Sequence, residues 1–218
     1  MDLESGHHTI QIFFIVLWIM MPAYLANTIA VLTGGKYPID QGKMHSDGNR
    51  ILGDGKTWSG LIGGTLGGII IGFLLLNFGD RILFQISHYC PSDQGNKFFG
   101  SLKIGDDFCY SANGKELWGE NHLFVFFLLS FGALFGDMVA SFYKRRQNLQ
   151  RGDKFPILDM YDFVFMSLLL CLIFQRDWLL SWFLDGWRPI FTILVLTPFL
   201  HRGVNIIGYK LGVKKEPW

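Results

Sequence analysis

Charged side chains are scarce in this sequence, and neither sign of charge dominates. Only 17% of the 218 residues are charged, whereas soluble domains carry about 25%. The formal net charge is +1, so no global basic field favours a nucleic acid as partner. Three cysteines are too few for a disulfide framework. Because half of the residues are apolar and the mean hydropathy is +0.29, the composition excludes an ordinary soluble domain and a disordered chain, and it predicts a membrane protein.

The apolar residues fall into five blocks, each long enough to cross a bilayer. A helix needs about 20 apolar residues to span a hydrocarbon core of about 30 Å. We therefore predict an all-α polytopic fold with about five transmembrane helices, built as one membrane-embedded domain over residues 1–218. The predicted spans are 10–32, 60–78, 123–143, 162–184 and 189–211.

Lysine and arginine are concentrated in two of the connections between these blocks. They gather in 33–59, in 144–160 and near the C-terminus, and they are absent from residues 1–9. By the positive-inside rule, such basic connections lie in the cytoplasm. The pattern predicts an N-terminus outside, a cytoplasmic C-terminus and a multi-pass protein of the cell membrane whose chemistry takes place on the cytoplasmic side.

The remaining long connection, 79–122, is then outside, and it is polar and long. It contains Cys90 and Cys109. In an oxidising exterior these two cysteines can form a disulfide, and two free thiols are the alternative. The sequence leaves both this pairing and the role of the connection open.

A glycine stripe runs along the second predicted span. Its members recur every four residues at Gly60, Gly64, Gly68 and Gly72. Small residues at this spacing let helix backbones approach closely in lipid. The stripe therefore indicates either packing within the chain or the face of a homodimer.

The first basic connection combines glycines, aspartates and cations. Asp40 and Lys43 are followed by the run Asp54, Gly55, Lys56 and Thr57. A glycine-rich turn with lysine and threonine can present backbone N–H groups and an ammonium group to phosphates. It is not a P-loop, because that motif requires glycine where Arg50 stands. The alternative is a membrane-interface loop whose lysines follow the charge rule alone.

The third predicted span ends with an acidic residue and a basic run on one helix face. Asp137, Ser141 and Lys144 are four and then three residues apart, so they share a face. An ionised aspartate in a span costs at least about 2.5 kcal/mol on insertion scales, and it usually lines a site or has a partner. An ion pair along the same helix with Lys144 or Arg145 is the alternative.

Two more aspartates begin the fourth predicted span. Asp159 and Asp162 are three residues apart, and one of them can serve as a helix cap. A single cap does not need two aspartates. Together with Asp137 they place three carboxylates near one membrane surface, among lysines and arginines. Carboxylates and phosphate oxygens are ligands that Mg²⁺ prefers, so the pattern predicts a site for Mg²⁺ and a polyphosphate.

These runs resemble those of a known family. The motifs are G-D-x-x-x-S-x-x-K-R-R at 136–146, P-x-L-D-x-x-D at 156–162, P-I-D-x-G-K at 38–43 and R-x-L-G-D-G-K-T-W at 50–58. Together they resemble the CDP-diglyceride synthetase superfamily and, within it, the archaeal-type branch of CDP-archaeol synthases. The resemblance covers most of the chain from Tyr37 to Asp162, and the five-span layout fits it.

The resemblance implies roles for particular residues. The expected catalytic residues are Asp137, Lys144, Asp159 and Asp162, with Asp137 and at least one of Asp159 and Asp162 as ligands of Mg²⁺. The expected nucleotide-binding residues are Asp40, Lys43, Asp54, Gly55, Lys56, Thr57, Ser141 and Arg145.

The implied reaction is the Mg²⁺-dependent transfer of CMP from CTP to a lipid phosphate in the bilayer. In this branch the acceptor is 2,3-di-O-geranylgeranyl-sn-glycero-1-phosphate, and the products are a CDP-activated lipid and pyrophosphate. One alternative is an ion- or proton-coupled transporter in which Asp137 is the coupling residue. Another is a lipid kinase, which releases a nucleoside diphosphate instead of pyrophosphate.

Overall fold

In the residues that it describes, the computed structural model has five helices that are long and apolar enough to cross a membrane. They span Ile12–Thr33, Trp58–Phe78, His122–Arg146, Ile157–Phe174 and Arg188–Lys210. The structure describes residues 3–86, 97–98, 101–104, 107–110, 118–149, 153, 155–183, 187–210 and 212. The predicted multi-pass all-α architecture is therefore confirmed for the membrane part of the chain.

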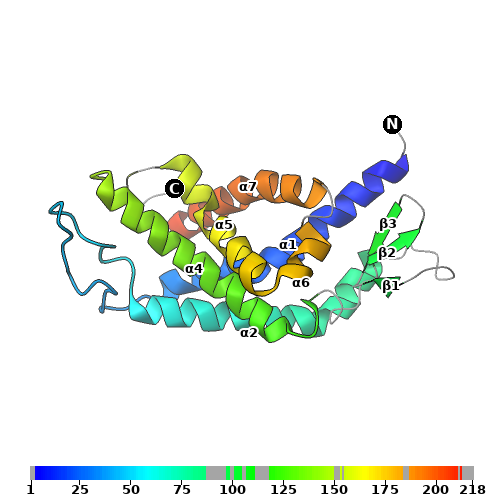
Figure 1. The fold of residues 1–218 in the computed structure, drawn as a ribbon, viewed down its shortest axis with the longest axis horizontal. Coiled ribbons are helices and arrows are strands. Elements are labelled where there is room, and N and C mark those ends of the chain that lie inside the picture. Colours follow the sequence, from blue (N-terminus) through cyan, green and yellow to red (C-terminus); the bar gives the residue numbers. More distant parts are fainter. Residues whose placement is uncertain are drawn as a thin grey trace.

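The helices follow the chain in a simple order. They are α1 (Leu3–Thr33), α2 (Trp58–Ile86), α4 (His122–Arg146), α5 (Pro156–Phe174), α6 (Arg176–Phe183) and α7 (Arg188–Lys210). α1, α2 and α4 pack against one another, α5 packs on α4, and α7 lies mainly against α1 (Figure 1). One contact that joins α1 to α7 is a hydrogen bond between the hydroxyls of Tyr24 and Thr197, 3.0 Å apart.

The fourth span differs from its predicted boundaries of 162–184. α5 begins at Pro156, because proline is well suited to the first turn of a helix. It ends at Phe174, since Gln175 leaves the helical conformation at φ −138° and ψ 49°. The residues that follow form the separate short helix α6. As a consequence, Asp159 lies in the first turn of α5, and Asp162 lies one turn further inside the helix.

The glycine stripe packs α2 against other helices of the same chain. A Cβ added to Gly64 would lie 2.8 Å from the carbonyl oxygen of Ala26 in α1, and one added to Gly72 would collide with the ring of Phe126 in α4. The stripe (Gly60, Gly64, Gly68 and Gly72) thus lets α2 approach both helices closely. The intramolecular interpretation is confirmed, and a homodimer through this face would require α2 to leave these neighbours.

The connection between α2 and α4 contains a small antiparallel sheet that the sequence analysis did not predict. Its strands are β1 (Lys97–Phe98), β2 (Ser101–Ile104) and β3 (Asp107–Tyr110), in the order β1-β2-β3. Ser101 of β2 pairs with Tyr110 of β3, and Lys97 of β1 pairs with Leu102 of β2. Cys90 lies outside the described residues, so the choice between a Cys90–Cys109 disulfide and two free thiols stays open.

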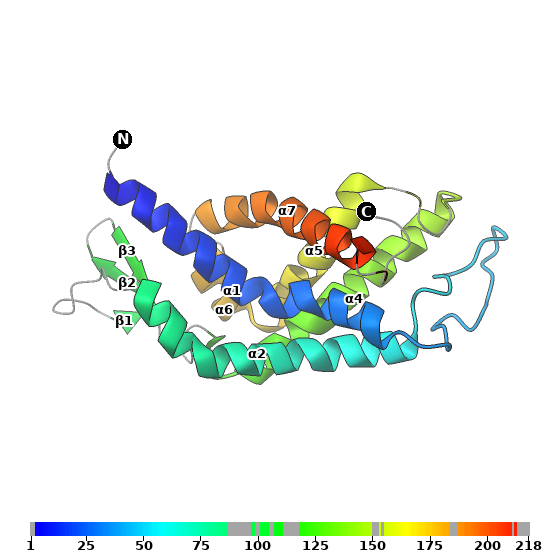
Figure 2. The ribbon, with the colours of Figure 1, turned by 180° about the vertical axis from the view of Figure 1, so that it is seen from behind.

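The two ends of the molecule differ in character. The sheet and the N-terminus lie at one end, whereas the loop between α1 and α2 lies at the other (Figures 1 and 2). The C-terminal ends of α4 and α7 are on the same side as that loop. The two basic connections predicted to share one membrane face are therefore brought to the same end of the structure.

Candidate active site

The loop 34–57, between α1 and α2, is folded around the carboxylate of Asp40. Its oxygens accept hydrogen bonds from the guanidinium of Arg50 at 2.7 and 3.2 Å, and from the backbone N–H groups of Leu52, Gly53 and Gly42 at 3.0, 2.9 and 3.2 Å. The Asp40 side chain is fully buried. Burial alone raises the pKa of this carboxyl, but the hydrogen bonds outweigh it and hold the pKa well below its ordinary value. The structure therefore places Asp40 inside the loop, where it fixes the loop's conformation.

The other predicted charges of this loop lie at its surface. Asp54 pairs with Nη1 of Arg50 at 2.8 Å, and its side chain is 70% exposed. Lys43 is exposed as well. These two residues are available to a ligand from solution, whereas Arg50, which bridges Asp40 and Asp54, holds the loop together. Arg50 was not assigned a role from the sequence, because its pairing with Asp40 depends on how the loop folds.

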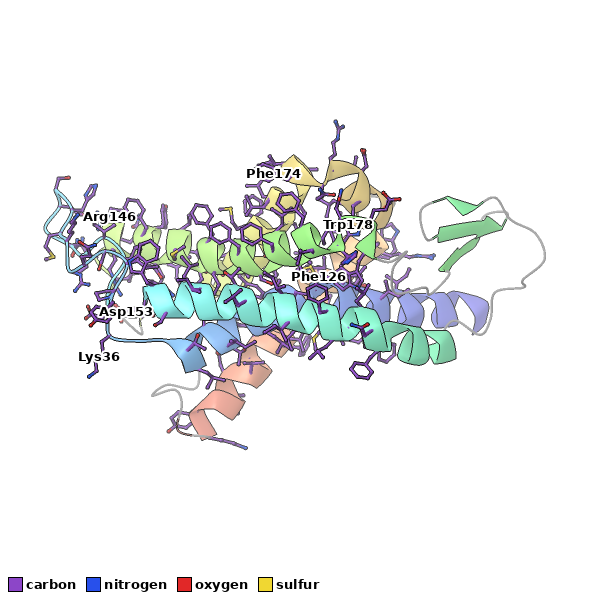
Figure 3. All side chains as sticks on the ribbon, turned by 90° about the horizontal axis from the view of Figure 1, so that it is seen from below. Lys36, Phe126, Arg146, Asp153, Phe174 and Trp178 are labelled. Carbon is purple, nitrogen blue, oxygen red and sulfur yellow. The ribbon has the colours of Figure 1, made fainter. Side chains whose placement is uncertain are left out.

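Loop 34–57 is fastened to the C-terminal end of α4. The guanidinium of Arg146 donates a 2.7 Å hydrogen bond to the carbonyl oxygen of Arg50, and its Nε lies 3.1 Å from a carboxylate oxygen of Asp47. Asn49 and Asn148 join the same two segments by a 2.8 Å hydrogen bond. Figure 3 shows Arg146 at the end of the molecule where this loop packs. Arg146 was counted only as part of a basic run, so this structural role was missed.

Gly53 packs against the guanidinium of Arg145. Its φ of +96° is one that residues with a Cβ rarely adopt, and an added Cβ would lie 3.2 Å from Nη2 of Arg145. Nη1 of Arg145 donates to the carbonyl oxygen of Leu149 at 2.5 Å. The predicted nucleotide-binding residue Arg145 therefore lies against the glycine turn that precedes Lys56.

Thr57 and Lys56 are held by the start of α2. The hydroxyl oxygen of Thr57 accepts the backbone N–H of Gly60 at 3.2 Å and that of Gly35 at 3.3 Å, which makes Thr57 a helix cap. The backbone of Lys56 is fixed by a 2.8 Å hydrogen bond from the N–H of Ile39. The helix start thus orients the Lys56 side chain away from the cap and toward α4.

The ammonium group of Lys56 forms an ion pair with the carboxylate of Asp137 in α4. The side chains are 22% and 39% exposed, so the pair is only partly shielded from solvent. The alternative in which Asp137 pairs with Lys144 or Arg145 along its own helix is wrong, because its partner comes from loop 34–57. Two segments that the sequence analysis treated separately therefore meet at one point.

A cavity of about 80 Å³ opens beside this ion pair. Gly55, Lys56 and Thr57 line it from the loop and the start of α2, and Asp137 lines it from α4. α1 contributes Asn27, which the sequence analysis did not single out because it is one polar residue within an apolar block. The remaining walls are mostly aliphatic.

A second ion pair lies nearer the end of α4. Nζ of Lys144 lies 2.9 and 3.2 Å from the two carboxylate oxygens of Asp159. Asp159 also accepts the backbone N–H of Phe155 at 3.0 Å, so it caps the first turn of α5 as the cap alternative predicted. Ser141 is partly buried between Asp137 and Lys144 on the same face of α4.

Asp162 approaches Asp137 because α4 and α5 are in close contact there. A Cβ on Gly136 would collide with the carbonyl oxygen of Asp162, so only glycine allows this approach. Asp162 therefore packs beside Gly136, the residue that precedes Asp137. One oxygen of its carboxylate accepts the backbone N–H of Phe163 at 2.6 Å. The glycine in the G-D pair at 136–137 therefore lets α5 pack against α4 next to Asp137.

The structure distributes the three predicted metal-binding aspartates over two places. Asp137 and Asp162 are near each other at the α4–α5 contact, whereas Asp159 is engaged by Lys144. In the part of the chain that the structure describes, no group of three or more His, Cys, Asp and Glu side chains is placed to hold a metal ion. Mg²⁺ usually takes one or two protein carboxylates together with phosphates and waters, so a pair of aspartates is a suitable donor set.

Comparison with known proteins gives a consistent result. The family model of CDP-archaeol synthases (CarS-like) matches residues 9–93 and 107–218, and that of the cytidylyltransferase family matches residues 54–150. The CDP-archaeol synthase of Methanospirillum hungatei is 44% identical over 200 residues, which are 91% of this chain and all of that protein. The CDP-archaeol synthase of Picrophilus torridus is 41% identical over 93% of this chain and 95% of its own.

A solved structure of an intramembrane enzyme for the biosynthesis of archaeal membrane lipids is also similar. The two chains are 27% identical and superpose with a TM-score of 0.52, over 82% of this chain and 88% of that one. The motifs that suggested the family thus belong to a likeness that extends along nearly the whole chain. The chain belongs to the CDP-archaeol synthase family of membrane nucleotidyltransferases.

Proposed function

We propose that this protein transfers CMP from CTP to the phosphate of a diether glycerol lipid, and that the Lys56–Asp137 pair marks the reaction centre. An oxygen of the lipid phosphate attacks the α-phosphorus of CTP, the bond from this phosphorus to the bridging oxygen breaks, and its electrons leave with pyrophosphate. The observation that carries the proposal is the meeting of the G-K-T loop and the G-D helix at one cavity. Family membership supports cytidylyl transfer to a lipid phosphate over a transporter or a kinase.

Asp137 and Asp162 are the residues that would hold Mg²⁺. They fit a metal because both supply a carboxylate at the contact between α4 and α5, and Asp137 already holds the ammonium group of Lys56. When bound, Mg²⁺ would neutralise charge on the phosphates and orient them for in-line attack. Asp159, which is bound to Lys144 and caps α5, is the less suitable of the two α5 aspartates.

The cations around the site would neutralise the triphosphate. Lys56 would exchange its contact with Asp137 for one with a phosphate oxygen, and Lys144 and Arg145 would hold the charge that develops on pyrophosphate. Because the lipid phosphate is already anionic, no general base is required. Catalysis then consists of positioning and charge neutralisation, as in phosphoryl transfer generally.

The remaining predicted residues have supporting roles in this proposal. Asp40 positions loop 34–57, and Thr57 caps α2 so that Lys56 faces α4. Lys43, Asp54 and Gly55 lie at the surface of the loop or of the cavity, where they can contact the nucleotide. We place the site on the cytoplasmic side of the cell membrane, because the connections that form it are those rich in lysine and arginine.

CTP labelled at either of two phosphates tests the reaction. Purified protein with Mg²⁺ is given CTP labelled at either the α- or the γ-phosphate, together with a diether glycerol phosphate, a diester phosphatidic acid or no lipid. We expect the α-label in the lipid and the γ-label in pyrophosphate, with the diether preferred. Transfer of the γ-label to lipid would identify a kinase, and preference for the diester would refute the proposed acceptor.

A further inference from the structure

Asn27 is a polar residue in a span that is otherwise largely apolar. It lies in α1, within the candidate membrane span Ile12–Thr33. Its side-chain oxygen Oδ1 is shielded from solvent and has no hydrogen-bond partner among the residues that the structure describes. A buried acceptor left without a donor destabilises the folded protein. A ligand that supplied a donor next to Oδ1 would satisfy this acceptor.

The cavity beside the Lys56–Asp137 pair also reaches α1. Asn27 lines the same cavity as Lys56, Thr57 and Asp137, from the α1 side. The polar side chains across the cavity are already engaged, since Lys56 is paired with Asp137 and Thr57 caps α2. The nearby walls from α1 and α4, Ala30, Val31, Leu134 and Met138, carry no polar side-chain group to offer.

The chemistry of the two substrates decides which of them supplies the donor. This step rests on the proposed function. A glycerol phosphate with both remaining hydroxyls etherified has no O–H or N–H group apart from the phosphate itself, and the phosphates of a nucleotide are acceptors. The nucleoside carries donors: two ribose hydroxyls and the exocyclic amino group of cytosine.

We propose that Asn27 binds the nucleoside of the nucleotide substrate, with Oδ1 accepting a hydrogen bond from a ribose hydroxyl or from the cytosine amino group. α1 is then part of the nucleotide site, although every motif of the site lies in loop 34–57, α4 and α5. A hydrogen bond to a buried acceptor discriminates strongly against an analogue that lacks the donor, because that analogue leaves the acceptor unpaired.

The test pairs a substitution with nucleotide analogues. Asn27→Leu removes the amide at similar size, and Asn27→Ala does so without adding bulk. Transfer and equilibrium nucleotide binding are measured with CTP, 2′-deoxy-CTP, 3′-deoxy-CTP and UTP. The control is Asn77→Leu, since the amide of Asn77 donates to the carbonyl oxygen of Phe73 in its own helix at 2.8 Å.

We expect both Asn27 variants to bind CTP about tenfold more weakly, with an unchanged KM for the lipid phosphate. Wild type should discriminate against one class of analogue, and that discrimination should disappear in the variants. If the variants lose discrimination against a deoxy analogue, the donor is a ribose hydroxyl. If they lose discrimination against UTP, the donor is the cytosine amino group.

The inference is overturned if CTP binding changes by less than twofold, if the loss is the same for every analogue, or if only the KM for lipid rises. Discrimination by wild-type protein is measured independently of the variants, so its absence overturns the inference even if a variant fails to fold. Failure of the proposed function would appear differently, as nucleotide binding without transfer of CMP to any lipid.

Discussion

The ammonium group of Lys56 lies against the carboxylate of Asp137, although 81 positions separate the two residues in the chain. One comes from the loop before α2 and the other from the C-terminal half of α4. Each was predicted to belong to the site for its own reason, and the structure joins them. In the resting protein the carboxylate that is proposed to bind metal is therefore already neutralised by a cation of the same chain.

The first prediction concerns the loss of either charge. Lys56→Ala should lower kcat/KM by about 10²-fold or more, since a charge contact that strengthens in the transition state is lost. Asp137→Asn should abolish transfer while the detergent-solubilised protein keeps its fold. Activity and Tm are measured on the same preparations. Retained activity per folded molecule in Asp137→Asn would refute the metal-site assignment.

The second prediction concerns competition for Asp137. If a divalent cation replaces the Lys56 ammonium on this carboxylate, Lys56→Met should bind Mn²⁺ about tenfold more tightly than wild type when no nucleotide is present. Lys144→Met should leave this affinity unchanged, because Lys144 pairs with Asp159 instead. Electron paramagnetic resonance of free Mn²⁺ gives both values. Equal affinities in wild type and Lys56→Met would exclude the competition.

The third prediction concerns the buried carboxylate of the loop. Asp40→Asn removes a charge that receives five hydrogen bonds, and it should destabilise loop 34–57 by about 1.5–3 kcal/mol. Rapid proteolysis within 34–57 reports this loss. Asp54→Asn is the matched control, since Asp54 is 70% exposed, and its loop should resist the protease as wild type does.

The fourth prediction is the pH dependence of the same loop. The pKa of Asp40 is lower in the folded protein than its unfolded value of about 3.9. Its contribution to stability is therefore fully present above about pH 4 and is lost as the pH falls through the folded pKa. Titration of Asp40 should leave the protection of loop 34–57 from proteolysis unchanged between about pH 5 and 8. Below about pH 4 this protection should decline. In Asp40→Asn that acid-induced decline should be smaller.

The fifth prediction concerns the contact that brings Asp162 toward Asp137. Gly136→Ala should cost about 1–3 kcal/mol and should lower activity at least tenfold, because an added methyl group forces α4 and α5 apart. Gly203→Ala in α7 is the control, since an added Cβ there meets no atom within 4 Å. Activity per folded molecule separates the loss of activity from the loss of stability. If Gly136→Ala were as active as Gly203→Ala, the spacing of the two aspartates would be unimportant.

Topology can be tested by cysteine labelling. In a background without the three native cysteines, Gly100→Cys should react with an impermeant reagent from outside, and Ser46→Cys should be protected. The prediction follows from the lysine and arginine content of the connections. Labelling of position 46 from outside would place the site on the wrong face for cytoplasmic CTP.

The sequence allowed the spans and most of the site to be predicted because both depend on local patterns. Apolar runs gave the five helices, and helical spacing placed Asp137 and Lys144 on one face. The partners of these residues depend on tertiary contacts, so the same-helix ion pair was the wrong alternative. The end of α5 was also misjudged, since the apolar residues of α6 continue the run after Gln175.

Other site features carry too weak a signal for a single sequence. Asp40 was predicted to contact the nucleotide, and nothing in its motif indicates that Arg50 and three backbone N–H groups enclose it. Arg146 looks like one more residue of a basic run. Asn27 is an isolated polar residue in α1, and its place at the cavity follows only from how α1 packs against α2 and α4.

The small sheet of β1, β2 and β3 has a practical consequence. It lies at the opposite end of the molecule from loop 34–57 (Figure 1), so a bulky attachment there leaves the cavity free. A protein of 24.9 kDa that is mostly within the bilayer offers few features by which electron cryomicroscopy can align single particles. An antibody fragment raised against this connection, or a rigid fusion inserted into it, would supply an external marker while turnover continues.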